Sequence, residues 1–390
     1  MLIILLIIIG CSQIDSPHLS QEKPVKHWSK LTLREKVAQM IMIRIRGDFY
    51  HDEHWYRKSL RKWLSEDGIG GVISFGGSIH GTFYNIQTFQ EWSKIPLLVA
   101  ADYERGLGQW MRGATLFPSN MAVAATGNTD FSFQQGKVTA TEANAIGVHI
   151  TLAPVMDVNN NPENPIINFR SYSDDPNMVI EYGNAFIKGV QEGGIYACAK
   201  HFPGHGNTNM DSHSSLPSIK GSRIELENVE LKPFKSAIEN GVKMIMVGHI
   251  SMPGLDSSNV PASYSKLITT GLLRDEWGFE GIIITDGMEM GGLTESTWAG
   301  ESAVRAVEAG ADILLLPMDV DQTIDALVSA VESGRISENR INAGKRIFEL
   351  RKNKDEFIDF LECLQLVDKL KICLLKNKSI LDDNRCNSAS

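Results

Sequence analysis

The densest cluster of chemically reactive side chains lies in the stretch KHFPGHGNTNMDSH, from Lys200 to His213. It contains three histidines, a lysine and an aspartate. Its proline and two glycines predict a loop rather than a helix. The apolar run at 195–199, directly before it, is typical of a buried strand. Ionisable groups at this density, next to the end of a strand, indicate a reaction site.

Metal binding is the competing interpretation of this stretch. The three histidines and Asp211 could in principle ligate zinc. Two histidines four residues apart share a face only on a helix, and Pro203 prevents a helix between His201 and His205. The spacing therefore favours acid–base chemistry, and we expect neither a metal nor another cofactor. For His205 alone, a structural role within the loop is the preferred interpretation.

Eight short apolar runs alternate with longer amphipathic stretches along the chain. The runs are rich in Val, Ile and Leu without alternating polar residues, which is typical of parallel strands covered on both faces. They predict an α/β fold, a single (β/α)8 TIM-type barrel with a short C-terminal tail; an open doubly wound sheet is the alternative. The predicted strands are 40–45, 71–75, 97–101, 148–154, 195–199, 244–247, 282–285 and 313–316, and predicted helices include 131–145, 178–191, 223–240 and 300–309.

Polar residues follow these strands one after another, which favours the barrel. A barrel gathers the C-terminal ends of all its strands around one mouth, where the active sites of this fold lie. An open sheet would spread the same residues along an edge. The residues at these ends include Asp102, Glu104, Asp157, Arg170, Lys200, His201, His249, Asp286 and Asp319.

Composition restricts the partners of the protein. Of its 390 residues, 43% are hydrophobic and 22% are charged, which is ordinary for a globular protein. The net charge of −9 argues against nucleic acid as a partner. The five cysteines include no C-x-x-C pair, so neither a zinc ribbon nor a disulfide framework is indicated.

The N-terminus carries an unbroken apolar run at 2–9, followed by Gly10 and Cys11. The run is too short to span a bilayer, and it resembles a bacterial lipoprotein signal, whose cleavage leaves a lipidated cysteine. We therefore expect a signal at 1–11, lipidation of Cys11, a polar tether at 12–28 and a lipid-anchored location in the cell envelope. No Lys or Arg precedes the run, and an accidental apolar stretch on a cytoplasmic protein is the alternative.

Five longer motifs occur in order within residues 29–352. They are APVMDV at 153–158, NPIINFRS at 164–171, KHFPGHG at 200–206, DSH at 211–213 and TDGMEM at 285–290. Together they resemble the barrel domain of glycoside hydrolase family 3, specifically its β-N-acetylglucosaminidase branch. Residues 353–390 would then be a tail, as a remnant of a second domain.

The resemblance implies a retaining exo-β-N-acetylglucosaminidase, a glycoside hydrolase of the β-N-acetylhexosaminidase type. Asp286 would be the nucleophile that forms a covalent glycosyl intermediate. His213, oriented by Asp211, would be the acid/base in place of the second carboxylic acid that most retaining glycosidases use. Its expected substrates are β-linked amino-sugar oligosaccharides, either peptidoglycan fragments or chitin-type chains, and a monomer is expected. The sugar would contact Asp102, Arg170, Lys200, His201, His249 and Met290.

Structural alternatives remain for four of these residues. Asp286 could instead cap the following helix. Arg170 could form a surface ion pair with Asp174 or Asp175. His249 and Met290 could simply pack in the core.

Two positions depart from the family pattern. The family usually shows Asp-x-Glu-Gly-Gly, with an arginine that touches the ligand eight residues after the aspartate. Here the stretch at 102–110 is DYERGLGQW, and Trp110 stands in the arginine's place. Trp110 could stack on a sugar on the leaving-group side, so substrate preference is the property that this change affects. Asn207 stands where the family often has aspartate.

Three other functions are compatible with the sequence. A histidine acid/base repels phosphate less than a carboxylate does, so a β-N-acetylglucosaminide phosphorylase is one alternative. A β-glucosidase or xylosidase is another. A non-catalytic sugar-binding lipoprotein is the third, although a binder would have no need of Asp286, Asp211 and His213 together.

Overall fold

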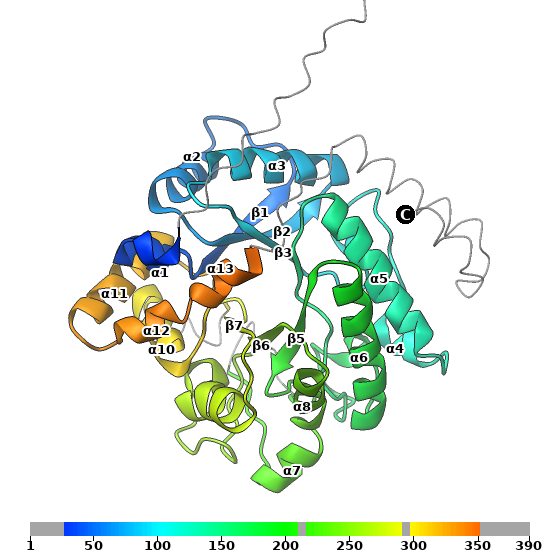
Figure 1. Ribbon diagram of the computed structural model, residues 1–390. Helices are drawn as coiled ribbons and strands as arrows, with labels where there is room; N and C mark the ends of the chain where they lie inside the picture. Colours follow the sequence, from blue (N-terminus) through cyan, green and yellow to red (C-terminus); the bar gives the residue numbers. More distant parts are fainter. Residues whose placement is uncertain (1–26, 210–215, 291–296, 352–390) are drawn as a thin grey trace, which may run out of the picture.

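A ring of parallel strands forms the centre of the computed structural model (Figure 1), which describes residues 27–209, 216–290 and 297–351. The predictions for Cys11, Asp211, His213 and the tail at 353–390 lie outside these residues. The strands are β1 Ile41–Gly47, β2 Gly71–Gly77, β3 Leu98–Ala101, β4 Ile150–Thr151, β5 Tyr196–Phe202, β6 Met244–Val247, β7 Ile282–Thr285 and β8 Leu314–Leu315.

The strands close into a barrel. Neighbouring strands pair in the order β7-β6-β5-β4-β3-β2-β1-β8. The two ends of this order meet, because Ile284 of β7 forms a parallel bridge with Ile313 and the Thr285 N–H donates to the Ile313 carbonyl at 3.0 Å. Every residue of β3, β6 and β7 is buried, as the uninterrupted apolar runs predict. The (β/α)8 prediction is therefore confirmed, and the open sheet is excluded.

Helices surround the strands (Figure 1), and local sequence signals fix several of their ends. Thr32 and Glu35 form a reciprocal capping box at the start of α1. The predicted helix at 223–240 is divided into two, because Pro233 has no N–H to continue a helical hydrogen-bond ladder. The helices are α1 Leu33–Ala38, α2 Trp55–Lys62, α3 Ile79–Trp92, α4 Asn120–Ala124, α5 Asp130–Ala145, α6 Pro176–Glu192, α7 Arg223–Asn228, α8 Lys232–Glu239, α10 Ala299–Ala309, α11 Val320–Glu332, α12 Glu338–Asn342 and α13 Lys345–Arg351, with π-helices η2 Trp63–Asp67 and η6 Leu267–Glu276.

The fifth strand is longer than its apolar run. The predicted strand ends at residue 199, but β5 continues to Phe202 and includes Lys200 and His201. The Lys200 N–H donates to the Pro154 carbonyl at 3.1 Å, and the Met156 N–H donates to the Lys200 carbonyl at 2.6 Å. These polar residues therefore lie on the barrel wall rather than in the loop after it. Among the described helices, none combines the length and hydrophobicity that a membrane-spanning segment needs.

Candidate active site

Asp286 directly follows β7 at the mouth of the barrel. Its backbone N–H donates to the Val247 carbonyl of β6 at 2.9 Å, which fixes the turn out of the strand. Its carboxylate oxygen Oδ1 accepts from the Gly287 N–H at 2.8 Å. The residue is half-buried, so part of its surface remains accessible.

The surroundings of Asp286 keep its carboxylate ionised. Burial alone would raise the pKa of Asp286, since it penalises the charged form. The nearby imidazoles of His201 and His249 outweigh that effect, with help from the Gly287 N–H and Lys200, and hold the pKa below its ordinary range. An ionised carboxylate at a strand end, within reach of the mouth, has the protonation state that a nucleophile requires.

A buried cluster of two cations and two carboxylates lies beside it. The Lys200 ammonium is 2.6 Å from Asp102 Oδ1 and 2.8 Å from Glu104 Oε1. Arg170 donates two hydrogen bonds to the Glu104 carboxylate, from Nε at 3.0 Å and from Nη2 at 2.7 Å. Burial would lower the pKa of Lys200, but the two carboxylates raise it, so the lysine stays charged. Two of its three N–H donors point at these carboxylates, and among the described residues the third is left for a ligand.

Glu104 is a site residue for which the sequence predicted no role beyond its position at a strand end. Its side chain is only 6% exposed, and it joins Lys200 to Arg170. Arg170 does not pair with Asp174 or Asp175, the partners considered from the sequence; Asp175 instead caps α6 by accepting from the Asn177 N–H. Two signals were available: Glu104 lies two residues beyond Asp102 at a strand end, and it matches the glutamate of the family's Asp-x-Glu pattern.

Replacing Glu104 by glutamine is expected to destabilise the fold by roughly 3–5 kcal/mol, because it leaves buried cations with one carboxylate fewer. Burial would raise the pKa of Glu104, but Lys200 and Arg170 lower it overall. The stabilisation is therefore fully present above the ordinary pKa of 4.5 and is lost progressively as pH falls from 4.5 through the lowered value. Urea unfolding at pH 7 and at pH 3 measures both effects.

The exposed Glu163 provides the matched control for this substitution. Glu163→Gln should change the free energy of unfolding by less than about 0.5 kcal/mol, as exposed positions usually do. A Glu104→Gln protein as stable as the wild type at pH 7 would contradict the structural role of the cluster.

Asp157 anchors the loop that follows β5. Its fully buried carboxylate is 2.7 Å from His201 Nδ1 and accepts from the backbone N–H groups of His201 and His205, the latter at 2.6 Å. With Nδ1 held in this way, His201 Nε2 faces Arg170 Nη2 at 3.5 Å. Burial would raise the pKa of Asp157, and His201 more than offsets it, so this carboxylate is charged as well. Asp157 was recognised from the sequence only as a strand-end residue, without this role.

His205 and His249 are both buried. His205 Nδ1 lies 2.7 Å from Thr208 Oγ1, which supports a structural role in the loop. His249 Nδ1 lies 2.8 Å from Ser263 Oγ, and its Nε2 lies 3.1 Å from the Gly287 carbonyl. His249 thus steadies the turn that carries Asp286, and direct contact with a sugar stays a prediction for it. Met290 is buried against the same turn.

Trp110 forms the opposite rim of the mouth. Its indole N–H donates to the Asp102 carbonyl at 2.9 Å, and 39% of the residue is exposed. Its ring packs edge-on against Phe75, with 5.1 Å between centroids. The residue in place of the family's arginine therefore presents an aromatic surface beside Asp102. Arg112, nearby in sequence, instead pairs with Asp48 at 3.5 Å.

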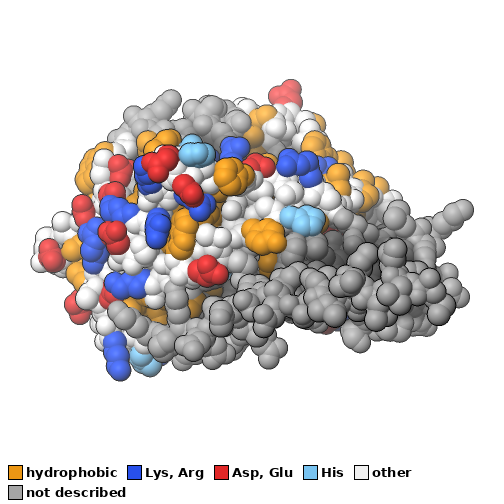
Figure 2. Space-filling view, turned by 90° about the horizontal axis from the view of Figure 1, so that it is seen from above, with side chains coloured by type: hydrophobic (Ala, Val, Ile, Leu, Met, Phe, Trp, Pro, Cys, Tyr) orange, Lys and Arg blue, Asp and Glu red, His pale blue; other side chains and the backbone are white. Residues whose placement is uncertain are grey.

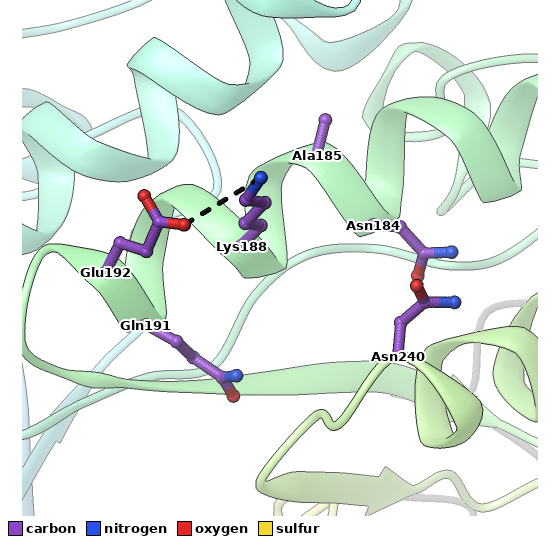
Figure 3. A pocket seen from close by; sticks show the side chains of 6 residues that line it. All are labelled: Asn184, Ala185, Lys188, Gln191, Glu192 and Asn240. Carbon is purple, nitrogen blue, oxygen red and sulfur yellow. Dashed lines mark ion pairs between the residues drawn. The ribbon is translucent and has the colours of Figure 1, made fainter.

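The described residues hold no group of three or more His, Cys, Asp or Glu that could bind a metal ion. They do contain a polar hollow of about 460 Å³ away from the mouth, between α6 and the end of α8. Figure 3 shows Asn184, Lys188, Gln191 and Asn240 on its walls. Gln191 uses both ends of its amide to hold the chain before β6, donating to the Gly241 carbonyl at 3.1 Å and accepting from the Lys243 N–H at 3.1 Å. At this end of a barrel, such contacts serve stability.

The chain is similar to several known proteins. The family described as "Glycosyl hydrolase family 3 N terminal domain" matches residues 32–350. "Beta-hexosaminidase A" of Pseudoalteromonas piscicida is 32% identical in an alignment of length 326 that covers 75% of this chain and 54% of that protein. "Beta-hexosaminidase" of Tolumonas auensis is 35% identical in an alignment of length 262 that covers 65% of this chain and 77% of that protein. The chain spans about half the length of the Pseudoalteromonas relative.

Two solved structures share the fold. A glycoside hydrolase family 3 beta-N-acetylglucosaminidase from Paenibacillus sp. superimposes with a TM-score of 0.78 at 34% identity, covering 87% of this chain and 68% of that one. A beta-glucoside phosphorylase bound to 2FGlc superimposes with a TM-score of 0.81 at 28% identity, covering 87% and 63%.

Proposed function

Because the chain belongs to glycoside hydrolase family 3, we propose that it is a retaining exo-β-N-acetylglucosaminidase that removes terminal β-linked N-acetylglucosamine from oligosaccharides. The observation that carries this proposal is the arrangement at the mouth. An ionised Asp286 lies beside the Lys200–Glu104–Arg170 cluster, with Asp102 on its rim. The names of the Pseudoalteromonas and Paenibacillus proteins support an amino sugar as the substrate.

The charged cluster would bind the terminal sugar. Asp102 is held by Lys200 through one oxygen, and its half-buried carboxylate would accept hydrogen bonds from two ring hydroxyls. The third N–H of Lys200 and the second N–H on Nη1 of Arg170, whose other N–H donors already face Glu104, His201 and the Ile166 carbonyl, would donate to sugar oxygens. Because Glu104 fixes both of these donors before the substrate arrives, little orientation entropy is lost on binding.

Asp286 would attack the anomeric carbon. Its carboxylate oxygen forms a bond to that carbon as the bond to the leaving oxygen breaks, which gives a covalent glycosyl-Asp286 intermediate. The leaving oxygen takes a proton from an acid/base, for which we propose His213 oriented by Asp211. These two residues lie outside the described residues, so their part rests on the DSH motif. The same imidazole would then deprotonate the water that releases the sugar with retained configuration.

A comparison of two chromogenic substrates tests the amino-sugar specificity. Nitrophenyl N-acetyl-β-glucosaminide and nitrophenyl β-glucoside have the same leaving group and differ only in the acetamido group. We expect kcat/KM to be roughly 10²-fold or more higher for the acetamido substrate, because a site built to bind a polar substituent rejects the analogue that lacks its hydrogen bonds. Equal values would instead favour a β-glucosidase, and no turnover of either would end the proposal.

Phosphorolysis is the second candidate, favoured by the likeness to the beta-glucoside phosphorylase. Phosphate would replace water in the second step and yield a sugar 1-phosphate. The same assay with and without phosphate, followed by product analysis, distinguishes the two reactions.

A further inference from the structure

A second hollow, of about 300 Å³, opens on the segment that leads from β1 into α2. Aromatic side chains line it, among them Phe49, Tyr50, Trp55 and Tyr56, together with Arg44 of β1. Phe49 is 88% exposed and Trp55 is 67% exposed. Two large rings are therefore exposed at its edge, and Trp55 also stacks against His54 with 5.9 Å between centroids. Exposed apolar surface is costly unless something covers it.

The floor of this hollow is held in place. Tyr56 donates its hydroxyl to the Arg44 carbonyl at 2.6 Å, and the Tyr50 hydroxyl accepts from the Arg46 N–H at 2.6 Å. The rings of Tyr50 and Tyr56 stack with 6.4 Å between centroids. A ligand would therefore meet a preorganised surface, which reduces the entropic cost of binding.

An unbroken line of contacts joins the hollow to the mouth of the barrel. Arg44, on its wall, forms an ion pair with Glu289, which lies three residues after Asp286. The Arg44 guanidinium also lies 5.2 Å from the centre of the Phe75 ring. Phe75 packs against Trp110, whose indole is bonded to the Asp102 carbonyl. Contacting side chains thus link the hollow to Asp102 on one side of the candidate active site and to the segment after Asp286 on the other.

We propose that this hollow is a leaving-group subsite that binds the sugars beyond the bond to be cleaved, an inference that rests on the proposed function. Pyranose rings have apolar C–H faces and polar edges. The exposed rings of Phe49 and Trp55 can pack against the apolar faces of the sugars. Arg46 and Asp48, which line the same hollow, can form hydrogen bonds with the polar edges. Trp110 would contact the first leaving-group ring, and Phe49 and Trp55 the rings after it.

The wider surface fits a carbohydrate better than a membrane. Among the described residues, Figure 2, seen from the side that carries α2 and α3, shows hydrophobic side chains interspersed with basic and acidic ones. A membrane-binding face would instead need a continuous apolar surface flanked mainly by basic residues. Mixed polar and apolar contacts are what an amphipathic sugar chain requires.

The test compares leaving groups of different length. In wild-type protein and the variants Phe49→Ala and Trp55→Ala, kcat/KM is measured for nitrophenyl N-acetyl-β-glucosaminide and for the tetrasaccharide of β-1,4-linked N-acetylglucosamine. We expect the ratio of tetrasaccharide to nitrophenyl values to fall roughly 2- to 10-fold for each ring removed, the size of one aromatic stacking contact. Trp55→Phe, which keeps an aromatic face, should recover most of the loss.

Tyr84→Ala is the control, since Tyr84 is an aromatic residue of α3 that is 58% exposed and does not line the hollow. Its ratio should equal that of the wild type. Unchanged ratios in both Phe49→Ala and Trp55→Ala would overturn the inference. Binding to anionic lipid vesicles is measured for the same variants, and a loss of that binding with an unchanged ratio would also overturn it. If the wild-type protein cleaves neither substrate, the proposed function itself fails. This result differs from the two outcomes above, in which the wild type is active.

Discussion

Asp286→Ala is expected to lower kcat on nitrophenyl N-acetyl-β-glucosaminide by roughly 10⁴- to 10⁶-fold, the usual loss when a covalent nucleophile is removed. Without the carboxylate, no atom is positioned to form the glycosyl intermediate at the anomeric carbon. The fold should survive, because the Val247 carbonyl is bonded by the backbone of residue 286, which the substitution keeps. Steady-state kinetics and a thermal unfolding curve measure the two effects separately.

Adding azide to the Asp286→Ala protein tests directly whether Asp286 is the nucleophile. A small anion can occupy the space that the carboxylate leaves and attack the anomeric carbon directly. We expect azide to restore part of the rate with the nitrophenyl substrate and to yield the α-glycosyl azide, in which the configuration is inverted. Asp275→Ala removes an exposed carboxylate from η6 and should keep full activity. A β-configured azide product, or an Asp286→Ala enzyme with wild-type activity, would rule out Asp286 as the nucleophile.

The pH dependence of kcat/KM gives a second measure of the same group. Because its surroundings hold the pKa of Asp286 below its ordinary value of 3.8, the carboxylate is charged throughout the neutral and mildly acidic range. Activity that depends on this carboxylate is therefore retained above pH 3.8 and falls only as the pH drops through the lowered pKa.

The barrel could be predicted from the sequence because its strands are buried on both faces. Runs such as 244–247 and 282–285 coincide with β6 and β7 to the residue. The location of the candidate active site could then be predicted from the fold, because polar residues after successive parallel strands must converge once the sheet closes. Asp102, Lys200 and His201 do come together there, linked through Glu104, Arg170 and Asp157.

The partnerships within the mouth could not be predicted in the same way. A carboxylate at a strand end can face a ligand, a neighbouring cation or a backbone N–H, and only the side-chain positions decide between them. Glu104 and Asp157 were therefore left without a role, although both are buried. The extent of β5 was missed for a related reason, because Lys200 and His201 carry no apolar pattern and are held in the strand by those buried carboxylates.

His213→Ala is expected to lower kcat by roughly 10²- to 10⁴-fold on β-1,4-linked N-acetylglucosamine oligosaccharides, the contribution that a general acid typically makes. A sugar alkoxide is a poor leaving group, so it must be protonated as the bond breaks. A dinitrophenolate needs no proton, and the loss should be far smaller for dinitrophenyl N-acetyl-β-glucosaminide. Asp211→Asn should produce a milder loss and move the basic limb of the pH profile to lower pH, since a neighbouring carboxylate raises the pKa of an imidazole.

The contrast between the two substrates is what assigns the proton to His213. A general loss of folding or of binding would slow both substrates alike, whereas loss of the acid alone affects the one whose leaving group is basic. His27→Ala, at an exposed histidine that precedes α1 and contacts Ser29, is the matched histidine control and should leave both rates unchanged. Equal losses on the oligosaccharide and the dinitrophenyl substrate would remove His213 from the role of acid. In that case the proton must come from another group at the mouth. The azide product would still test, independently, whether Asp286 is the nucleophile.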